Sequence, residues 1–468
     1  MADRPSPPTE SSTPLQLTAE SLRTWGLKSA LALVDQGLFS GAGFLVNLLL
    51  ARWLAPASYG AFAVAFAAFL FISGFHNVLL LEPLMVMGPG RHSDNLPAYF
   101  RVQLLIHFLL VGWLAVAGLL GGVALWRVRP DSPLVGAIFG IALMLPLLLL
   151  LWLVRRMCYV MQRPGLAVAG TASYLVLIIA GLAILRYLGW ATPLFAFFLM
   201  GTASLVASGV LLARFGFFRG PQTVSDISWR AALRENWTYG RWLTGSAVLY
   251  SIASQIQMFL VAGVLGLGAA GVLRAMQLPS LLMTQVVTAA GLMVLPAFSR
   301  DFSRGAIKKL RQHAVLTSLS LAGMALLFAG LTWLSAKPLE TLLFGGKYAS
   351  YASLMSLFVL ATAAAGLCQG LGMALRAARK PQFDLISNGV AAPIAIAFVY
   401  FFTKWWGLTG AALGVASVFA VQAAMTIVCY YAMLARPKDL GSLEITEQMV
   451  VGSAGDGLQV KTTKASTP

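Results

Sequence analysis

Amide and hydroxyl side chains recur on one face of a strongly apolar segment near the start of the chain. Within residues 28–50, Gln36, Ser40 and Asn47 fall on the same side of a helix at 100° per residue. Polar groups in an apolar setting cost free energy unless they are hydrogen-bonded, so a face that carries several of them indicates a functional or structural role. Such side chains either line a water-filled cleft that holds a hydrophilic solute or hydrogen-bond one helix to another.

The same pattern returns in three later apolar segments, 58–83, 238–264 and 269–295. Amides are concentrated on the opening segments of both halves of the chain, which favours a cleft between the halves over simple helix adhesion. The residues that we expect to line a substrate cavity in this cleft are Gln36, Ser40, Asn47, His76, Asn77, Ser251, Gln255, Arg274, Gln277 and Gln285.

Three charged residues lie within or close to apolar segments. Arg274 lies about five residues inside its segment, where its planar guanidinium suits the oxygens of a phosphate or pyrophosphate; alternatively it snorkels or pairs with a structural partner. Asp35 and Glu82 are candidates for coupling transport to an ion or a proton, and they are equally suited to pair with Lys28 or other basic groups. His107 is expected to pack alone rather than to exchange protons.

Catalytic and metal-binding patterns are missing from the sequence. It contains no GxxxxGK[ST], HExxH or GxSxG motif, and the three cysteines, Cys158, Cys368 and Cys429, are dispersed in or beside apolar segments. We therefore predict a protein that is not an enzyme, uses no cofactor and binds no metal, and whose cysteines serve as packing residues.

The amino-acid composition indicates the environment in which the chain folds. The chain has 468 residues, of which 59% are hydrophobic and 10% are charged, whereas soluble domains are about 25% charged. This balance predicts a protein that lies mostly in a lipid bilayer. The net charge of +17 then reflects Lys and Arg that hold loops on the cytoplasmic side, so we expect no nucleic-acid partner.

Twelve apolar segments are long enough to cross a bilayer as helices, because unpaired backbone groups are too costly in hydrocarbon. The predicted fold is therefore an all-α polytopic membrane protein with about twelve transmembrane helices in two six-helix lobes. The segments are 28–50, 58–83, 99–123, 134–154, 165–186, 192–213, 238–264, 269–295, 312–335, 353–375, 382–403 and 407–433.

Basic residues predict the orientation. The segments on the side of both termini carry 25 Lys and Arg, the opposite loops carry 7, and Arg274 completes the 33. Such a bias predicts that the N- and C-termini are cytoplasmic. The predicted divisions are a disordered tail (1–27), an N-terminal lobe (28–213), an amphipathic linker (214–237), a C-terminal lobe (238–433) and a second disordered tail (434–468).

The linker contains a four-residue repeat of large apolar side chains. Trp229, Leu233 and Trp237 follow Ser228, a suitable N-cap, and predict a short amphipathic helix on the inner membrane surface. An ordinary solvated loop is the alternative.

The two halves of the chain resemble each other. "ARWLAPASYGAF" (51–62) aligns with "AGVLGLGAAGVL" (262–273) at an offset of 211, which matches Gly60 to Gly271, and Ser40 and Ser251 correspond at the same offset. The basic–proline turn of "QRPGL" (162–166) returns in "RKPQF" (379–383). Because each half has an even number of spans, the repeats are predicted to be parallel and related by an axis along the membrane normal.

Residues 35–86 resemble the polysaccharide transporter branch of the multidrug/oligosaccharidyl-lipid/polysaccharide (MOP) exporter superfamily. The resemblance rests on "LARWLAPASYGAFA" (50–63) and "GFHNVLLLEP" (74–83), with weaker similarity in "LLFGGKY" (342–348), "ARKP" (378–381) and "WGLTGAALGVAS" (406–417). It implies a cavity between two lobes, lined largely by the first, second, seventh and eighth helices.

The resemblance also implies a function. Members of this branch flip polyprenyl-pyrophosphate-linked oligosaccharide repeat units, the precursors of O-antigen and exopolysaccharide, across the bacterial inner membrane by alternating access. The expected partners are the lipid-linked substrate, the bilayer and the polysaccharide polymerase and chain-length machinery. The alternative is an ion-coupled multidrug exporter on the same fold.

Overall fold

The computed structural model describes residues 19–215, 227–378, 380 and 382–432, and every regular element within these ranges is helical. The predicted tail 434–468 and most of the tail 1–27 lie outside the described residues. Residues 19–27 are described, and they form the start of the first helix rather than part of a tail.

The first half contains seven α-helices and the second half six. The first seven are α1 (Ala19–Trp53), α2 (Pro56–His76), α3 (Glu82–Arg91), α4 (Leu96–Val128), α5 (Pro133–Val160), α6 (Pro164–Tyr187) and α7 (Pro193–Arg214). The last six are α8 (Trp229–Leu265), α9 (Leu267–Ser303), α10 (Ile307–Leu334), α11 (Ala336–Phe344), α12 (Ser353–Ala377) and α13 (Gln382–Tyr430). A π-helical turn, η1 (Asn77–Leu81), joins α2 to α3, and short 3₁₀ turns, η2 (Ser93–Asn95) and η3 (Ala349–Tyr351), precede α4 and α12.

Eleven described helical segments are long and apolar enough to cross a membrane, and the last of them, Gln382–Tyr430, is long enough to cross it twice. Helix α13 has 49 residues, about 73 Å at 1.5 Å per residue, which is more than twice the thickness of a hydrocarbon core. Its backbone leaves helical geometry at Gly407 (φ 59°, ψ −137°), and a Cβ at Gly410 would overlap the carbonyl oxygen of Phe402. The chain therefore folds back at Gly407, and the predicted number of twelve crossings is confirmed.

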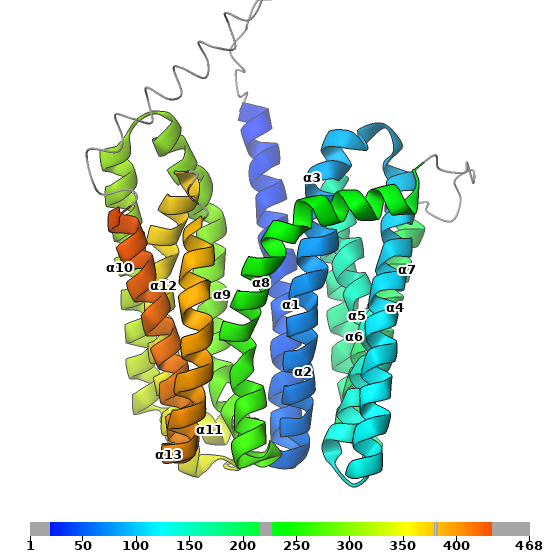
Figure 1. Ribbon diagram of the computed structural model, residues 1–468, viewed down its shortest axis with the longest axis vertical. Helices are drawn as coiled ribbons and strands as arrows, with labels where there is room; N and C mark the ends of the chain where they lie inside the picture. The colour runs from blue at the N-terminus through cyan, green and yellow to red at the C-terminus, as the bar shows by residue number, and fades with distance from the viewer. Residues whose placement is uncertain (1–18, 216–226, 379, 381, 433–468) are drawn as a thin grey trace, which may run out of the picture.

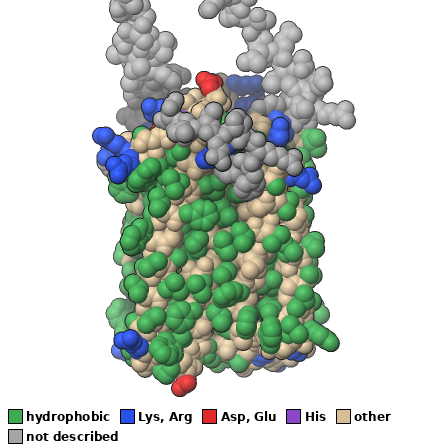
Figure 2. Space-filling view, turned by 90° about the vertical axis from the view of Figure 1, so that its right-hand side faces the viewer, with side chains coloured by type: hydrophobic (Ala, Val, Ile, Leu, Met, Phe, Trp, Pro, Cys, Tyr) green, Lys and Arg blue, Asp and Glu red, His purple; other side chains and the backbone are tan. Residues whose placement is uncertain are grey.

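Figure 1 shows both described chain ends at one end of the bundle, as an even number of crossings requires. We call this the termini end and the opposite one the α11 end. On the face seen in Figure 2, apolar side chains cover the middle of the molecule, and Lys and Arg lie near its two ends. This distribution fits a belt that faces lipid, so the chain is a multi-pass membrane protein.

The predicted repeat is visible as a reciprocal contact between the two halves. A Cβ at Gly60 of α2 would overlap the carbonyl oxygen of Leu267, and a Cβ at Gly271 of α9 would overlap that of Pro56. Gly60 and Gly271 are 211 residues apart, as are Pro56 and Leu267. The matched glycines therefore meet across the pseudo-two-fold axis and let the first turns of α2 and α9 touch at the α11 end.

Helix α8 begins by crossing the termini end of the first lobe and then turns into the bundle (Figure 1). Glu235 bonds Arg91 at 2.8 Å and His92 at 3.2 Å, and the buried amides of Asn236 and Gln103 bond each other in both directions. Trp229 and Trp237 remain exposed. Ser228 occupies the N-cap position but its side chain forms no capping bond.

Candidate functional site

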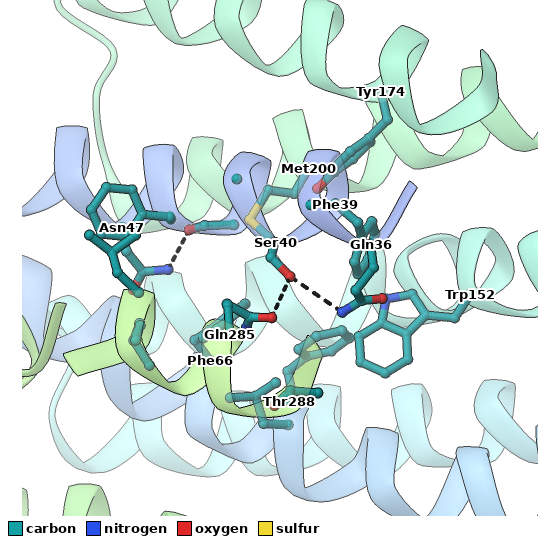
Figure 3. A pocket seen from close by; sticks show the side chains of 18 of the residues that line it. Gln36, Phe39, Ser40, Asn47, Phe66, Trp152, Tyr174, Met200, Gln285 and Thr288 are labelled. Carbon is teal, nitrogen blue, oxygen red and sulfur yellow. Dashed lines mark hydrogen bonds between the residues drawn. The ribbon is translucent and has the colours of Figure 1, made fainter. Parts of the chain in front are cut away.

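A cavity of about 640 Å³ lies between the two halves of the molecule, and Figure 3 shows it from close by. Its walls come from α1, α2, α5, α6 and α7 of the first half and from α9 of the second half. The lining of α9 runs from Arg274 to Ala289, which is about 22 Å along the helix axis. The cavity is thus elongated along the direction in which the helices cross the membrane.

A row of amide and hydroxyl groups joins α1 to α9 inside the cavity. Gln36 donates from Nε2 to Ser40 Oγ at 3.3 Å, and Ser40 donates to Gln285 Oε1 at 3.1 Å. Gln36 and Gln285 are both exposed to the cavity, so their remaining amide atoms face it. This row can exchange hydrogen bonds with a polar solute without any change of charge.

Arg274 supplies positive charge near the α11 end of the cavity. Its Nε donates to Asn47 Oδ1 at 3.3 Å, and Asn47 also accepts a 3.4 Å bond from the Tyr59 hydroxyl. The guanidinium carbon lies 5.8 Å from the ring centre of Phe66. Within the described part of the chain Arg274 belongs to no ion pair, and no Asp or Glu lines the cavity.

Aromatic rings form the wall contributed by the first half. Trp152 of α5 stands nearly perpendicular to Phe39 and Phe69, at ring separations of 5.7 and 5.9 Å, and these edge contacts fix its orientation. Tyr174 of α6 lies 6.0 Å from Phe39. The cavity therefore pairs an aromatic wall with the polar row on α1 and α9.

Five of the ten predicted cavity residues line this cavity: Gln36, Ser40, Asn47, Arg274 and Gln285. Sequence reasoning missed the aromatic wall, because rings at helical spacing are ordinary core residues and carry no signal that distinguishes a lining position.

The structure places the other five residues elsewhere. His76 is buried and its Nε2 lies 2.9 Å from His107 Nδ1, while Asn77 donates to Glu82 at 3.2 Å across the π-helical turn. The remaining three, Ser251, Gln255 and Gln277, are on α8 and α9 but outside the lining, where Gln255 contacts Ser254 and Gln277 is buried.

The pseudo-symmetry explains why Ser251 is not in the cavity although its counterpart Ser40 is. The partner of Ser40 is Gln285, and the residue 211 positions before Gln285 is Gly74. A Cβ at Gly74 would lie only 2.9 Å from Ser251 Oγ. The glycine lets α2 and α8 pack closely, whereas the glutamine at the related position lies in the space between α1 and α9.

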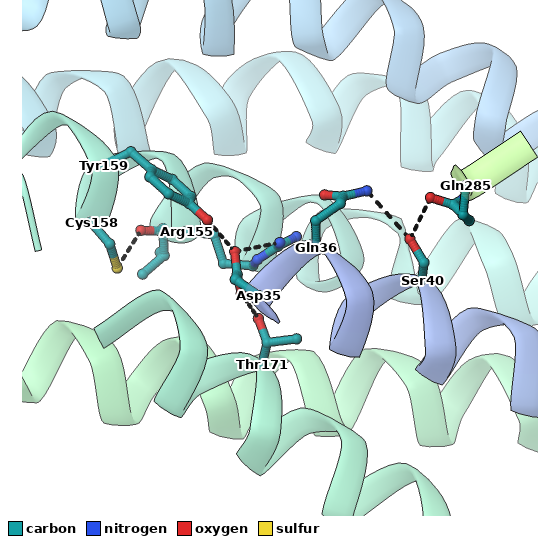
Figure 4. A network of polar contacts seen from close by, with 9 residues as sticks. Asp35, Gln36, Ser40, Arg155, Cys158, Tyr159, Thr171 and Gln285 are labelled. Carbon is teal, nitrogen blue, oxygen red and sulfur yellow. Dashed lines mark hydrogen bonds and ion pairs between the residues drawn. The ribbon is translucent and has the colours of Figure 1, made fainter. Parts of the chain in front are cut away.

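Asp35 is completely enclosed and does not line the cavity, and Figure 4 shows the polar contacts around it. It accepts an ion-pair bond of 2.7 Å from Arg155 and hydrogen bonds from the hydroxyls of Tyr159 and Thr171. Lys28, one predicted partner, instead donates to Gln162 at 3.4 Å. Pairing with a basic group is therefore the arrangement found for Asp35, with Arg155 as its partner.

Arg155 and His107 correct two expectations. Arg155 directly follows the predicted span 134–154, which predicts a basic residue of the next loop, yet it is buried in α5, with its guanidinium 4.1 Å from the ring centre of Phe39. His107 does not pack alone, because besides His76 it contacts the carbonyl oxygen of Pro146 at 3.0 Å. Both form polar contacts that join helices within the first lobe.

By sequence, the chain matches no family model and no curated protein. Comparison of structures gives the class of fold. The chain is similar to an inward-facing multidrug resistance MATE family transporter of the MOP superfamily, with a TM-score of 0.70, 14% identity and coverage of 86% of this chain and 98% of that one. A mutant of the Vibrio cholerae MATE transporter VcmN gives a TM-score of 0.62, 16% identity and coverage of 88% and 97%.

A third similar structure is named for a lipid substrate. The lipid II flippase MurJ in an inward closed conformation gives a TM-score of 0.65, 12% identity and coverage of 92% of this chain and 94% of that one. All three are described as transporters or flippases rather than enzymes. At these identities the likeness establishes the fold alone, an all-helical fold that this chain shares with the MATE and MurJ structures.

Proposed function

We propose that the protein is a MOP-type transporter that flips polyprenyl-pyrophosphate-linked oligosaccharide repeat units across the bacterial inner membrane. The observation that carries this proposal is the charge of the cavity: its lining contains Arg274 and no carboxylate among the described residues. A cationic cavity favours an anionic substrate and disfavours the small cationic molecules that multidrug exporters carry.

The remaining lining supports the same substrate class. A guanidinium binds pyrophosphate oxygens through paired, charge-assisted hydrogen bonds. The amides of Gln36 and Gln285 supply donors and acceptors for sugar hydroxyls, and the aromatic wall offers faces for sugar rings. The lipid chain stays in the bilayer while the head group crosses the cavity, and the polymerase and chain-length machinery are the expected partners on the outer side.

The cavity is closed at the α11 end, where Gly60 and Gly271 bring α2 and α9 together. With the termini end in the cytoplasm, as the basic residues predict, this arrangement corresponds to an inward-facing state. Transport then requires the lobes to separate at the α11 end and to approach at the termini end.

An ion-coupled multidrug exporter is the second candidate, and one observation favours it. The aromatic wall built from Phe39, Phe69 and Trp152 suits apolar ring systems as well as sugars. Deleting the gene separates the candidates, since the flippase predicts loss of surface polysaccharide with lipid-linked repeat units trapped inside. Unchanged polysaccharide with new drug sensitivity would select the exporter instead.

Replacing Arg274 tests the site itself. In the deletion strain, R274Q should lower polysaccharide export by roughly 10- to 150-fold at equal protein level, the value of one charge-assisted hydrogen bond of about 1.5–3 kcal/mol. R274K should retain part of the activity, because the charge remains and the paired geometry is lost. R186Q is the matched control, since Arg186 is exposed at the end of α6 and outside the cavity. An R274Q variant with wild-type export would remove Arg274 from the site.

A further inference from the structure

The segment Leu342–Tyr348, "LLFGGKY", joins the two lobes at the α11 end. It begins in the last turn of α11 and ends before η3, so it belongs to the second lobe. Gly345 and Gly346 both adopt positive φ (73° and 82°), which turns the chain sharply and directs Lys347 toward the first lobe. The buried carboxylate of Glu340 fixes this turn by accepting a 2.7 Å bond from the backbone amide of Tyr348.

The Lys347 ammonium caps the end of α1. It donates to the carbonyl oxygens of Ala51, Arg52 and Leu54 at 3.1, 2.6 and 2.8 Å, which uses all three of its N–H donors. Carbonyls in the last turn of a helix have no partner within the helix, and the helix dipole favours a cation there. The buried Tyr348 hydroxyl adds a 3.1 Å bond to the Ala51 carbonyl.

The first lobe returns the same type of contact. Arg52, at the end of α1, donates from Nη1 to the carbonyl oxygen of Leu342 at 3.0 Å, in the last turn of α11. Each lobe thus caps a helix of the other lobe with a cation. The three side chains of Arg52, Lys347 and Tyr348 form what we call the outer latch.

We propose that Lys347 is a gating residue, whose ammonium holds the two lobes together at the α11 end and sets how readily the cavity opens there. When the lobes separate at this end, the carbonyls at the end of α1 exchange the ammonium for water. Lys347 is exposed in the closed state, and when the lobes separate water replaces its ammonium at the carbonyls of the buried residues Ala51 and Leu54, so hydrogen bonds are exchanged rather than lost. The outer latch therefore biases the equilibrium without preventing turnover. It rests on the proposed movement of the lobes, but not on the identity of the substrate.

Spin-label distances between the lobes test this role. In a background in which Cys158, Cys368 and Cys429 are replaced by alanine, labels at Ala57 of α2 and Thr341 of α11 report the separation at the α11 end. Both positions are exposed. The full chain is reconstituted in nanodiscs of phosphatidylethanolamine and phosphatidylglycerol. We expect K347M to raise the population with the longer distance about 3- to 10-fold over the parent, the effect of losing hydrogen bonds at an exposed site.

Two further variants make the measurement specific. Y348F removes only the hydroxyl that bonds Ala51, so it should shift the distances in the same direction by a smaller factor. K337M removes an exposed lysine of α11 that takes no part in the outer latch, and should leave the distribution unchanged. An unchanged distribution in K347M, or equal shifts in K347M and K337M, would overturn the proposal. If gene deletion leaves the surface polysaccharide unchanged but K347M still shifts the distance distribution, the proposed substrate is refuted and the gating role of Lys347 stands.

Discussion

Replacing Asp35 with asparagine removes the negative charge from a carboxylate that has no exposed surface. The side chain keeps nearly the same shape, so the change isolates the charge. Arg155, whose side chain is 10% exposed, then loses its ion-pair partner at 2.7 Å. Breaking one side of a buried ion pair costs about 3–5 kcal/mol, because an uncompensated charge stays in a poorly solvated place.

The double variant D35N/R155M removes both charges and should recover most of that loss, since apolar replacement of a buried pair is often neutral. R155M alone leaves the completely enclosed carboxylate with only the hydroxyls of Tyr159 and Thr171, so it should cost at least as much as D35N. Asp384 provides the control, because its bond to Arg376 at 3.0 Å is partly exposed and D384N should change stability by less than about 1 kcal/mol.

Reversible unfolding in mixed micelles measures these free energies, and a double-mutant cycle gives the coupling between Asp35 and Arg155. Transport is measured on the same variants. If D35N is as stable as the parent but inactive, Asp35 acts in ion or proton coupling and the structural assignment fails. If D35N is unstable and D35N/R155M is both stable and active, the pair holds α1 against α5 and takes no direct part in transport.

Two further changes test how the lobes and α8 are held. G60A should separate α2 from α9 or lower the melting temperature, because its Cβ overlaps the backbone oxygen of Leu267. G112A, in open space on α4, is the control and should be neutral. Equal melting temperatures and label distances for the two variants would contradict the close contact. N236L should lower the free energy of unfolding by about 1–3 kcal/mol, because it leaves the buried Gln103 amide without its partner. Q103L/N236L should regain stability in the same unfolding assay. No loss of stability in N236L would mean that the amide pair is not formed.

The fold could be predicted because few backbone structures are stable in the hydrocarbon core of a bilayer. Apolar segments of sufficient length must be helical, and the number and order of the twelve crossings follow from them. The repeat was readable because Gly60 and Gly271 serve a contact that only glycine permits, so both copies retain it. The start of α1 is harder to predict, since the polar residues before Lys28 have the composition of a tail and yet residues 19–27 are helical.

Contacts between distant segments limited the prediction of the site. Asp35 and Arg155 are 120 residues apart, and Arg155 follows directly after an apolar segment, so its sequence context is that of a loop cation. Only the packing of α1 against α5 and α6 brings the arginine to the carboxylate. The positive-inside count stays useful because it depends on many residues, and one buried arginine changes it little.

The sequence repeat predicts the lining of the cavity only in part. The repeat makes α1 with α9 and α8 with α2 equivalent pairs, which predicts polar residues of both pairs at one cleft. The two pairs differ where Gln285 corresponds to Gly74. A glycine allows backbone approach and an amide side chain requires space, so one pair closes around Ser251 and the other surrounds a cavity beside Ser40. The position of the site thus follows from the difference between the halves, and their similarity supplies the axis about which the lobes are arranged.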